Sequence, residues 1–172
     1  MPGDIIFLTG TSSSGKTSIA KILQASLPGA FLHVQFDAFI EMLPEHDLPI
    51  FKRMADGFHR SIVALSDADN PLIVDHVLVR EDWTKQCAQL LADRYVLFVG
   101  VHCPLEELER REAARDIRRQ GFARSQFEFI HAGKVYDVEV DTSLLTPEQA
   151  AAEIESAYRQ RRTGALKSLI KG

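Results

Sequence analysis

The sequence predicts an α/β protein in which helices cover both faces of a parallel β-sheet. Short apolar runs rich in β-branched residues alternate along the 172-residue chain with longer stretches of helical periodicity. The first run, residues 5–8, leads through a glycine-rich loop straight into a helical pattern. That order is typical of a buried parallel strand followed by its crossover. We therefore expect one domain over residues 1–172, which would bury about 70% of its unfolded surface.

The glycine-rich loop matches the phosphate-binding pattern G-x-x-x-x-G-K-[ST] without a mismatch. The predicted nucleotide-binding residues are Gly10, Thr11, Ser12, Ser13, Ser14, Gly15, Lys16, Thr17 and Ser18. Backbone N–H groups of residues 11–16 are expected to turn inward around phosphate oxygens, where Lys16 adds a positive charge. Thr17 is expected to place its hydroxyl on Mg²⁺. A glycine-capped turn with a surface lysine is the alternative, but the strand before and the helix after the loop favour a bound nucleoside triphosphate.

The remaining elements follow from the same periodicities. Strands are predicted over residues 31–36, 72–75, 96–101 and 136–141, and helices over about 15–27, 50–66, 83–91, 104–120 and from 147 onward. Pro104 opens the fourth helix, Gly121 is expected to end it, and a loop should follow as far as Gly133. Residues 146–149 form a capping box for the last helix. A basic tail covers about residues 159–172, and no structure is predicted for it.

Two aspartates close predicted strands at the sheet edge where ligands bind in open α/β folds. Asp75 ends the strand over residues 72–75 and could bind Mg²⁺, or hold one of its waters, beside Thr17; a turn cap is the alternative. Asp37 follows the strand over residues 31–36 and could accept the proton of a substrate hydroxyl as it attacks a γ-phosphate. Aspartate is also an ordinary helix N-cap, so the residues alone leave the role of Asp37 open.

Arginines are concentrated between residues 110 and 124. Six of the chain's 20 lysines and arginines lie there, namely Arg110, Arg111, Arg115, Arg118, Arg119 and Arg124. Three of them share one helical face, which is typical of a lid that brings arginines over a transferring phosphoryl group. We expect the lid over about residues 110–130, with Arg111 at the nucleotide and Arg115 and Arg118 in catalysis. Exposed i,i+4 pairs such as Glu107 with Arg111 are the alternative.

The overall composition narrows the partners. The net charge of −4 argues against duplex nucleic acid, although a local basic patch could override it. No apolar run is long enough for a membrane span, and the first strand begins too early to leave room for a signal peptide. Cys87 and Cys103 lie far apart in apolar patterns, which favours free thiols in a reducing compartment. A cytoplasmic protein is therefore expected, and a homo-oligomer is compatible with the sequence.

The most informative segments are residues 10–17, 36–40, 74–77, 111–115, the region of Gln126 and residues 131–142. Together they resemble the chloramphenicol phosphotransferase-like family of P-loop kinases. The last segment is the most specific, because generic phosphate-loop kinases do not carry it. The resemblance covers residues 4 to about 155. It implies a nucleoside-kinase-like, three-layer fold with five parallel strands, and an ATP-dependent kinase that phosphorylates a small-molecule hydroxyl, the type member acting on chloramphenicol.

The resemblance also implies roles for individual residues. Asp37 matches the family's proposed general base, Lys16 and Thr17 match its phosphate and metal positions, and Arg111, Arg115 and Arg118 match arginines of its lid segment. Between Ile40 and Leu72 the chain looks shorter than the antibiotic kinase. That segment should form much of the acceptor pocket, which Met42, Leu43, Phe51, Met54 and Phe58 could line unless they are core residues.

Two other functions remain open on the sequence. A GTPase switch would bind nucleotide through the same loop, but the chain has no Asn-Lys-x-Asp guanine signature and no Asp-x-x-Gly switch motif. A kinase acting on a nucleic-acid end or another macromolecule would use the arginine cluster to hold phosphates. Guanine preference in binding would favour the first, and salt-sensitive binding of oligonucleotides would favour the second.

Overall fold

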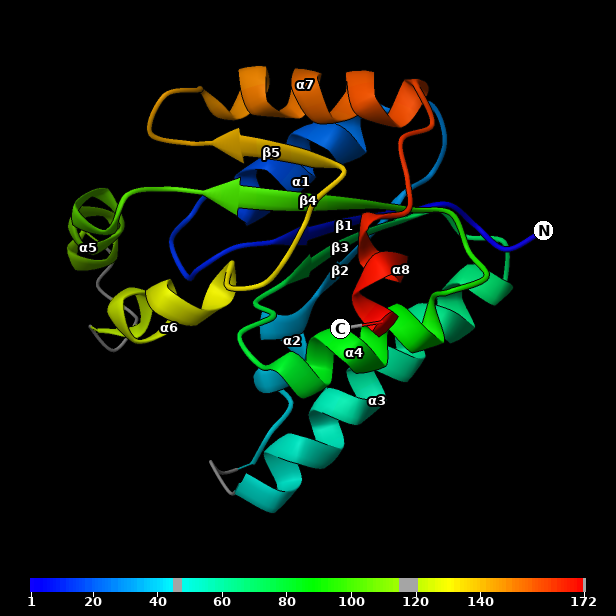
Figure 1. Cartoon of the computed structure of the whole chain (residues 1–172), viewed down its shortest axis with the longest axis horizontal. Coiled ribbons are helices and arrows are strands. Elements are labelled where there is room, and N and C mark those ends of the chain that lie inside the picture. The colour runs from blue at the N-terminus through cyan, green and yellow to red at the C-terminus, as the bar shows by residue number, and fades with distance from the viewer. Residues whose placement is uncertain (45–47, 115–120, 172) are drawn as a thin grey trace.

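The computed structural model confirms the predicted α/β fold, and it describes residues 1–44, 48–114 and 121–171 (Figure 1). Its strands are β1 (Ile5–Thr9), β2 (Leu32–Gln35), β3 (Leu72–His76), β4 (Val96–His102) and β5 (Val138–Asp141). Its helices are α1 (Lys16–Ser26), α2 (Phe36–Ile40), α3 (Leu48–Asp67), α4 (Glu81–Leu90), α5 (Leu105–Ala113), α6 (Phe122–Ile130), α7 (Pro147–Arg159), α8 (Ala165–Ser168) and the 3₁₀ turn η1 (Leu169–Lys171). The strands form one parallel sheet in the order β2-β3-β1-β4-β5.

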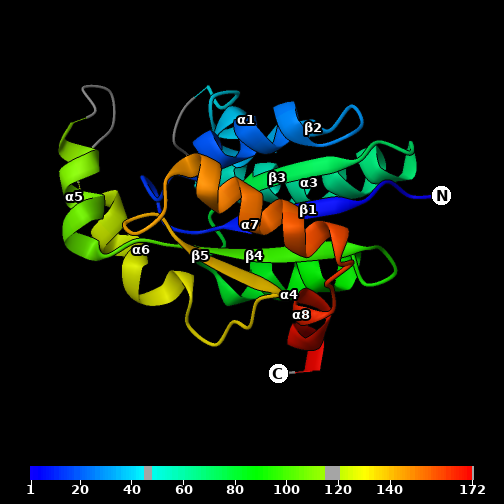
Figure 2. The same cartoon turned by 90° about the horizontal axis from the view of Figure 1, so that it is seen from above.

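Two hydrophobic layers hold the helices on the sheet. Alternate residues of β1 divide between them: Ile5 and Phe7 enter the layer shared with α3, α4 and α8, whereas Ile6 and Leu8 enter the layer shared with α1 and α7. Figures 1 and 2 show these helix groups on opposite faces of the sheet. Each large side chain that is fully buried in this way contributes about 1.5–3 kcal/mol relative to exposure. Two-sided burial explains why the strands read as continuous apolar runs.

The register of the sheet places the polar strand ends side by side. Leu8 pairs with Asp75 and Thr9 pairs with His76, so β3 delivers its carboxylate next to the last residues of β1. On the other side of β3, Gln35 also pairs with Asp75, which brings the start of α2 to the same edge. The loop that follows β1 therefore opens onto the ends of β2 and β3.

The segment from Gly121 onward differs from the prediction. Gly121 is the N-cap of α6, with a left-handed φ of 95°, where a loop was expected. The buried carboxylate of Glu112 accepts hydrogen bonds from the N–H groups of Gly121 (2.8 Å) and Ala123 (3.1 Å). These bonds satisfy donors that a helix start leaves unpaired. Glycine is frequent at both helix ends, so its presence alone did not show which end it marked.

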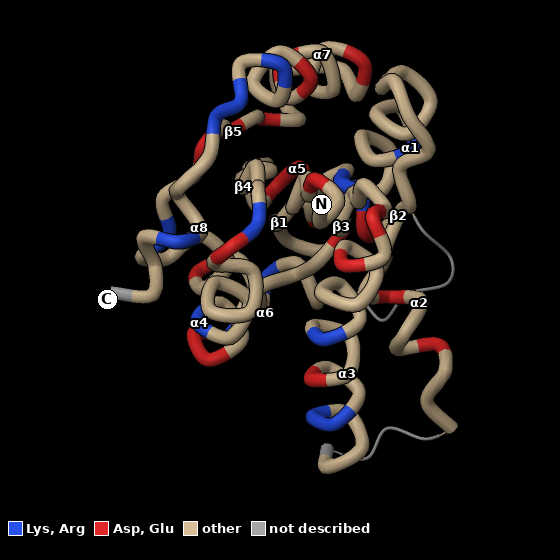
Figure 3. The backbone as a smooth tube through the Cα atoms, turned by 90° about the vertical axis from the view of Figure 1, so that its right-hand side faces the viewer, with Lys and Arg blue, Asp and Glu red and all other residues tan. Residues whose placement is uncertain are grey.

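The basic tail is folded onto the sheet as α8 and η1. Leu166 is only 2% exposed, and the side chain of Thr163 donates to the carbonyl of Val96 at 2.8 Å. Arg161 lies over the ring of Tyr95 at 3.6 Å and forms an ion pair with Asp4. Figure 3 shows the run of basic residues where the chain passes from α7 to α8. The tail is therefore basic at its surface, while the buried Leu166 packs it against the domain.

Smaller predictions also have clear outcomes. The capping box at Thr146 is present, with Gln149 as its reciprocal partner. Cys87 and Cys103 are free and buried. Phe58 is fully buried in the core, which is the alternative that the sequence left for it, whereas Met42 is 68% exposed. In the part of the chain that the structure describes, every helix is too short or too polar to cross a bilayer.

Candidate active site

The predicted loop and strand-end residues meet in a small pocket of about 50 Å³ at the edge of the sheet. We call it the phosphate-loop pocket. Its lining includes Ser12, Ser13, Gly15, Lys16, Thr17, Ser18, Phe36, Asp37, Asp75 and Val77. Most of the residues proposed from the sequence thus come together in one place. Gly10, Thr11 and Ser14 lie in the buried turn of the same loop.

The loop closes tightly because its glycines permit it. A Cβ at Gly10 would lie 2.4 Å from the carbonyl oxygen of Val101, and Gly15 begins α1 with a φ of 93°. Lys16 is 6% exposed, and its Nζ donates to the carbonyl of Thr11 at 2.7 Å. The hydroxyl of Ser13 is buried and has no hydrogen-bond partner among the described residues. A buried ammonium beside an unsatisfied hydroxyl fits the oxygens of a phosphate group.

Not every amide of the loop points inward. The N–H of Ser12 donates to Oε1 of Gln126 on α6 at 2.7 Å, and the N–H of Ser14 donates to the carbonyl of Thr11 at 3.3 Å. The expectation that all amides of residues 11–16 surround phosphate is therefore wrong for these two. The Gln126 contact ties α6 directly to the loop. No local pattern in the sequence could have predicted it, because the two residues are 114 positions apart.

Thr17 and Asp75 form the candidate metal-binding pair. The hydroxyl of Thr17 donates to Oδ2 of Asp75 at 2.7 Å, and Nε2 of His33 lies 3.6 Å from the same oxygen. Burial by itself raises the pKa of Asp75, but His33, Lys16 and Thr17 outweigh it and lower that pKa below its usual value. The carboxylate is therefore charged at neutral pH.

The donor set of this pair fits Mg²⁺. Hydroxyl and carboxylate oxygens are hard ligands, and Mg²⁺ usually takes one or two protein carboxylates together with substrate phosphates. Within residues 1–44, 48–114 and 121–171, no cluster of three or more His, Cys, Asp or Glu side chains could hold a metal alone. A metal ion here would depend on ligands from a bound nucleotide.

Asp37 lies in the first turn of α2, whose N-cap is Gln35, so Asp37 is not the helix cap that the sequence left as an alternative. Its half-buried side chain lines the same pocket as Lys16 and Asp75. The short helix begins where β2 ends, and the buried ring of Phe36 holds it against α3 through edge-to-face contacts with Phe51 and Phe58. Aromatic packing therefore places Asp37 at the pocket.

Arg111 reaches the back of the phosphate loop. Its Nε pairs with Glu107 at 2.7 Å, which is the i,i+4 pair considered from the sequence. Its Nη1 and Nη2 also donate to the hydroxyl (2.9 Å) and carbonyl (2.7 Å) of Thr142, and that hydroxyl donates to the carbonyl of Ser14. Arg111 thus lies near the loop as well as in an ion pair. Arg115 and Arg118 fall outside the described residues.

A chain of hydrogen bonds runs from Val77, which lines the pocket, through the buried His76 and His59 to Gln86. The N–H of Val77 donates to Nδ1 of His76 at 2.9 Å, so the proton of His76 is on Nε2, which faces Nε2 of His59 at 3.0 Å. His59 must then carry its proton on Nδ1, which donates to Gln86 at 2.7 Å. Burial lowers the pKa of both histidines and keeps them neutral. Both therefore act as fixed structural hydrogen-bonding groups.

The fold is similar to those of several solved structures, a kinase among them. APS kinase from Mycobacterium tuberculosis, solved in complex with AMPPNP and APS, matches with a TM-score of 0.72 at 17% identity over 92% of this chain and 98% of that one. A tunicamycin resistance protein from Deinococcus radiodurans matches with a TM-score of 0.70 at 21% identity, over 91% and 95% of the two chains. Identities this low show the fold alone.

Sequence comparisons are more specific. The protein Rv2636 of Mycobacterium tuberculosis (strain H37Rv), whose name proposes an O-phosphotransferase activity, is 28% identical over 186 residues, covering 91% of this chain and 83% of the relative. The family model for chloramphenicol phosphotransferase-like proteins matches residues 3–159. The chain therefore belongs to the chloramphenicol phosphotransferase-like family and is a phosphotransferase with the fold of P-loop kinases.

Proposed function

We propose that the protein transfers the γ-phosphate of MgATP to a hydroxyl group of a small molecule. The observation that carries this proposal is the lining of the phosphate-loop pocket. A buried ammonium (Lys16), a hydroxyl–carboxylate pair (Thr17 and Asp75) and a further carboxylate (Asp37) share one pocket of about 50 Å³. Phosphoryl transfer needs a cation on the phosphates, a metal site and a group that orients the nucleophile.

Each residue has a distinct role in this proposal. Lys16 and the loop hold the β- and γ-phosphates, and Arg111 supports the nucleotide side through Thr142. Thr17 and Asp75 would hold Mg²⁺, and the ion would neutralise part of the phosphate charge. Asp37 accepts the proton of the attacking hydroxyl, a contribution of about 10²–10⁴ in rate.

The arginines beyond α5 complete the proposed machinery. Arg115 and Arg118 are proposed to stabilise the charge of the transferring group, a role worth about 10³–10⁵ in rate for a well-placed arginine. The flanking helices support this assignment of roles. The N–H of Ser12 donates to Gln126 on α6 at 2.7 Å, and Arg111 on α5 donates to Thr142 at 2.9 Å.

The test is transfer of labelled γ-phosphate from ATP across a panel of hydroxyl compounds, with chloramphenicol included. Wild type should form a labelled phosphomonoester with at least one compound. Lys16→Met should lose about 10²–10³ in turnover, as expected for a preorganised donor to the reacting phosphate. Lys21→Met, an exposed change on the same helix, is the matched control and should behave as wild type. Label that appears only as inorganic phosphate with every compound would contradict the proposal.

A further inference from the structure

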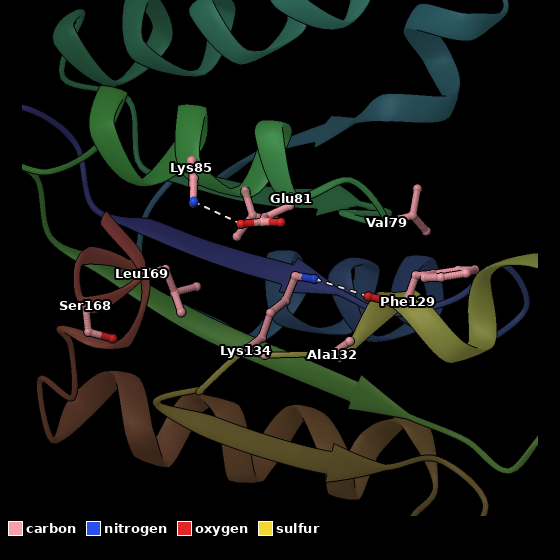
Figure 4. A pocket seen from close by; sticks show the side chains of 10 residues that line it. Val79, Glu81, Lys85, Phe129, Ala132, Lys134, Ser168 and Leu169 are labelled. Carbon is pink, nitrogen blue, oxygen red and sulfur yellow. Dashed lines mark hydrogen bonds and ion pairs between the residues drawn. The ribbon is translucent and has the colours of Figure 1, made fainter. Parts of the chain in front are cut away.

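A second, larger cavity lies beside the phosphate-loop pocket. It has a volume of about 540 Å³ and lies between the start of α4, the turn from α6 towards β5, and the C-terminal tail (Figure 4). We call it the tail cavity. Its apolar wall includes Val79, Phe129 and Leu169, and its polar lining includes Glu81, Lys85 and Lys134. Pockets of about 300–1,000 Å³ with a few polar groups are typical of small-molecule sites.

Two short segments connect this cavity with the phosphate-loop pocket. Val77 lines the phosphate-loop pocket and Val79 lines the tail cavity, and a tight turn joins them in which the N–H of Val79 donates to the carbonyl of Val77 at 3.0 Å. Two residues span at most about 7 Å. On α6, Gln126 contacts the phosphate loop and Phe129 lines the cavity, and three helical residues rise about 4.5 Å. The two pockets therefore have lining residues that lie within the length of a small molecule along these segments.

The charges of the tail cavity do not balance. Glu81 pairs with Lys85 at 2.9 Å, which leaves the half-buried Lys134 as an additional cation. Among the described residues, the hydrogen bond of Lys134 is a long one of 3.5 Å to the carbonyl of Phe129, drawn as a dashed line in Figure 4. Burial lowers the pKa of Lys134, and Glu81 opposes that shift. An ammonium that is only partly solvated and has one long hydrogen bond is stabilised by an anion.

We propose that the tail cavity binds the phosphate acceptor, and that the acceptor is an amphipathic small molecule with a carboxylate, or a comparable anionic group, remote from its reacting hydroxyl. This inference rests on the proposed function. The hydroxyl lies at Asp37, the apolar body passes Val79 and Phe129, and the anion pairs with Lys134. Chloramphenicol carries no anionic group, so it matches the cavity less well than a hydroxy acid of similar size.

The chemistry balances with the groups already named. A bond forms between the acceptor hydroxyl oxygen and the γ-phosphorus of ATP, and the bond from that phosphorus to the β,γ-bridging oxygen breaks. Asp37 takes the hydroxyl proton, and ADP leaves with the bridging oxygen. Lys134 takes no part in bond making; it is a specificity-determining residue whose effect falls on binding of the acceptor.

The first experiment compares two acceptors that differ only in charge, hydroxymethylbenzoate and hydroxymethylbenzamide. Wild type should favour the acid in kcat/KM by about ten- to a hundredfold, the range expected of one hydrogen bond to a charged group. Lys134→Gln should remove that preference, mainly through the KM of the acid, and leave the KM for ATP unchanged. Lys21→Gln, on the opposite face of the sheet, should keep the preference. Equal use of acid and amide by wild type, or an undiminished preference in Lys134→Gln, would overturn the inference while leaving phosphoryl transfer itself intact.

The second experiment measures binding without catalysis. Anilinonaphthalene sulfonate and phenylnaphthylamine share an aromatic body, but only the first carries an anion. Lys134→Gln should weaken fluorescence-detected binding of the sulfonate about tenfold or more and leave the neutral dye unchanged. Equal binding of the sulfonate by wild type and Lys134→Gln would overturn the assignment of an anion site. Lys134-dependent dye binding by a protein that phosphorylates no hydroxyl would contradict the proposed function and remove the cavity's role as an acceptor site.

Discussion

The phosphate-loop pocket and the tail cavity are neighbours built in opposite ways. The first consists of one contiguous loop, residues 10–18, and the ends of two paired strands. The second is assembled from segments near residues 79–85, 129–134 and 168–169, which meet because the tail packs against α4 and α6 packs against α5 and the phosphate loop. A contiguous loop keeps its geometry through short-range backbone bonds. An assembled cavity depends on packing between distant segments, and packing is what substitutions elsewhere can change.

This difference predicts how the two regions respond to substitution. Changes in the phosphate-loop pocket should alter chemistry with little effect on stability, because its polar side chains line a pocket at the edge of the sheet. Changes behind the tail cavity should alter stability and acceptor binding together, because the same contacts hold the segments in place.

The largest effect is expected for Asp37→Asn. The amide keeps the shape of the side chain but cannot accept the hydroxyl proton, so kcat should fall by about 10²–10⁴. The affinity for nucleotide and the free energy of unfolding should stay close to wild type, since Asp37 is proposed to contact the acceptor and is only half-buried. Steady-state kinetics with calorimetric nucleotide binding checks this. Full turnover at unchanged nucleotide affinity would show that Asp37 is not the base.

A smaller effect, on stability and the tail cavity, is expected for Gly100→Ala. A Cβ there would lie 2.7–3.0 Å from three ring carbons of Tyr136, whose hydroxyl bonds to Nδ1 of His131. Forcing extra volume into a packed site costs about 1–3 kcal/mol, and here it pushes on the segment that carries Lys134. The urea midpoint should fall, and the affinity for anilinonaphthalene sulfonate should weaken.

Gly57→Ala is the matched control for this change. It lies inside α3 with nothing within 4 Å of an added Cβ, so it should stabilise by about 0.5–1 kcal/mol. Nucleotide affinity should be unchanged in both variants. A Gly100→Ala protein that keeps both its unfolding midpoint and its dye affinity would contradict the claim that the cavity depends on this packing.

Glu112→Gln should have a more modest effect on the connection between the two regions. The variant replaces charge-assisted bonds to the N–H groups of Gly121 and Ala123 by weaker ones at the start of α6. Loss of helix capping costs about 0.5–2 kcal/mol. Because α6 carries Gln126, amide hydrogen exchange should rise along Phe122–Ile130 and at Ser12 before it rises in β1. Uniform exchange across all of these amides would mean that α6 does not open separately.

The smallest expected effect is the pH dependence of the free energy of unfolding, which comes from the buried histidines. Burial is the main reason that the pKa of His131 falls from 6.5 to about 4. Burial lowers the pKa values of His59 and His76 as well. Below pH 6.5 the unfolded chain binds protons that the folded chain does not, so the free energy of unfolding should fall as the pH is lowered from 6.5 towards about 4.

Urea unfolding between about pH 5 and 6.5 isolates this contribution, because most carboxylates titrate lower. His131→Gln and His59→Gln should each make the free energy of unfolding less dependent on pH. The first variant removes a histidine near the tail cavity, and the second removes one from the hydrogen-bonded chain that includes His76. Stability that is constant, or that rises on acidification, would contradict the neutral state assigned to these side chains.

Sequence patterns predicted the phosphate-loop side well and the tail side poorly, for physical reasons. The strand runs, the loop and Asp75 are local patterns, and parallel topology then forces them to one edge. The start of α6 at Gly121 was missed because the carboxylate that accepts from its first N–H groups belongs to Glu112, nine residues away in another helix. The catalytic roles of Arg115 and Arg118 remain predictions.

Residues 40–72 were expected to form much of the acceptor pocket, and that expectation stays a prediction, although Phe58 lies in the core. The tail cavity, which we propose as the acceptor site, instead draws on segments 79–85 and 129–134. Leu169 reaches that cavity because the tail packs against α4, and a basic tail gives no sequence signal for such packing. Composition shows that the tail is basic, but tertiary contacts decide whether a residue such as Leu169 lines a cavity.

Two pockets that serve one transfer reaction must be filled at the same time. Calorimetric titration of AMPPNP with Mg²⁺ into protein saturated with anilinonaphthalene sulfonate tests this directly, with dye fluorescence followed in parallel. The nucleotide should bind in the phosphate-loop pocket while the dye stays bound near Lys134, and Lys16→Met should weaken the nucleotide without releasing the dye. Dye that leaves in step with nucleotide binding would show that the tail cavity belongs to the nucleotide site, and that the acceptor lies elsewhere.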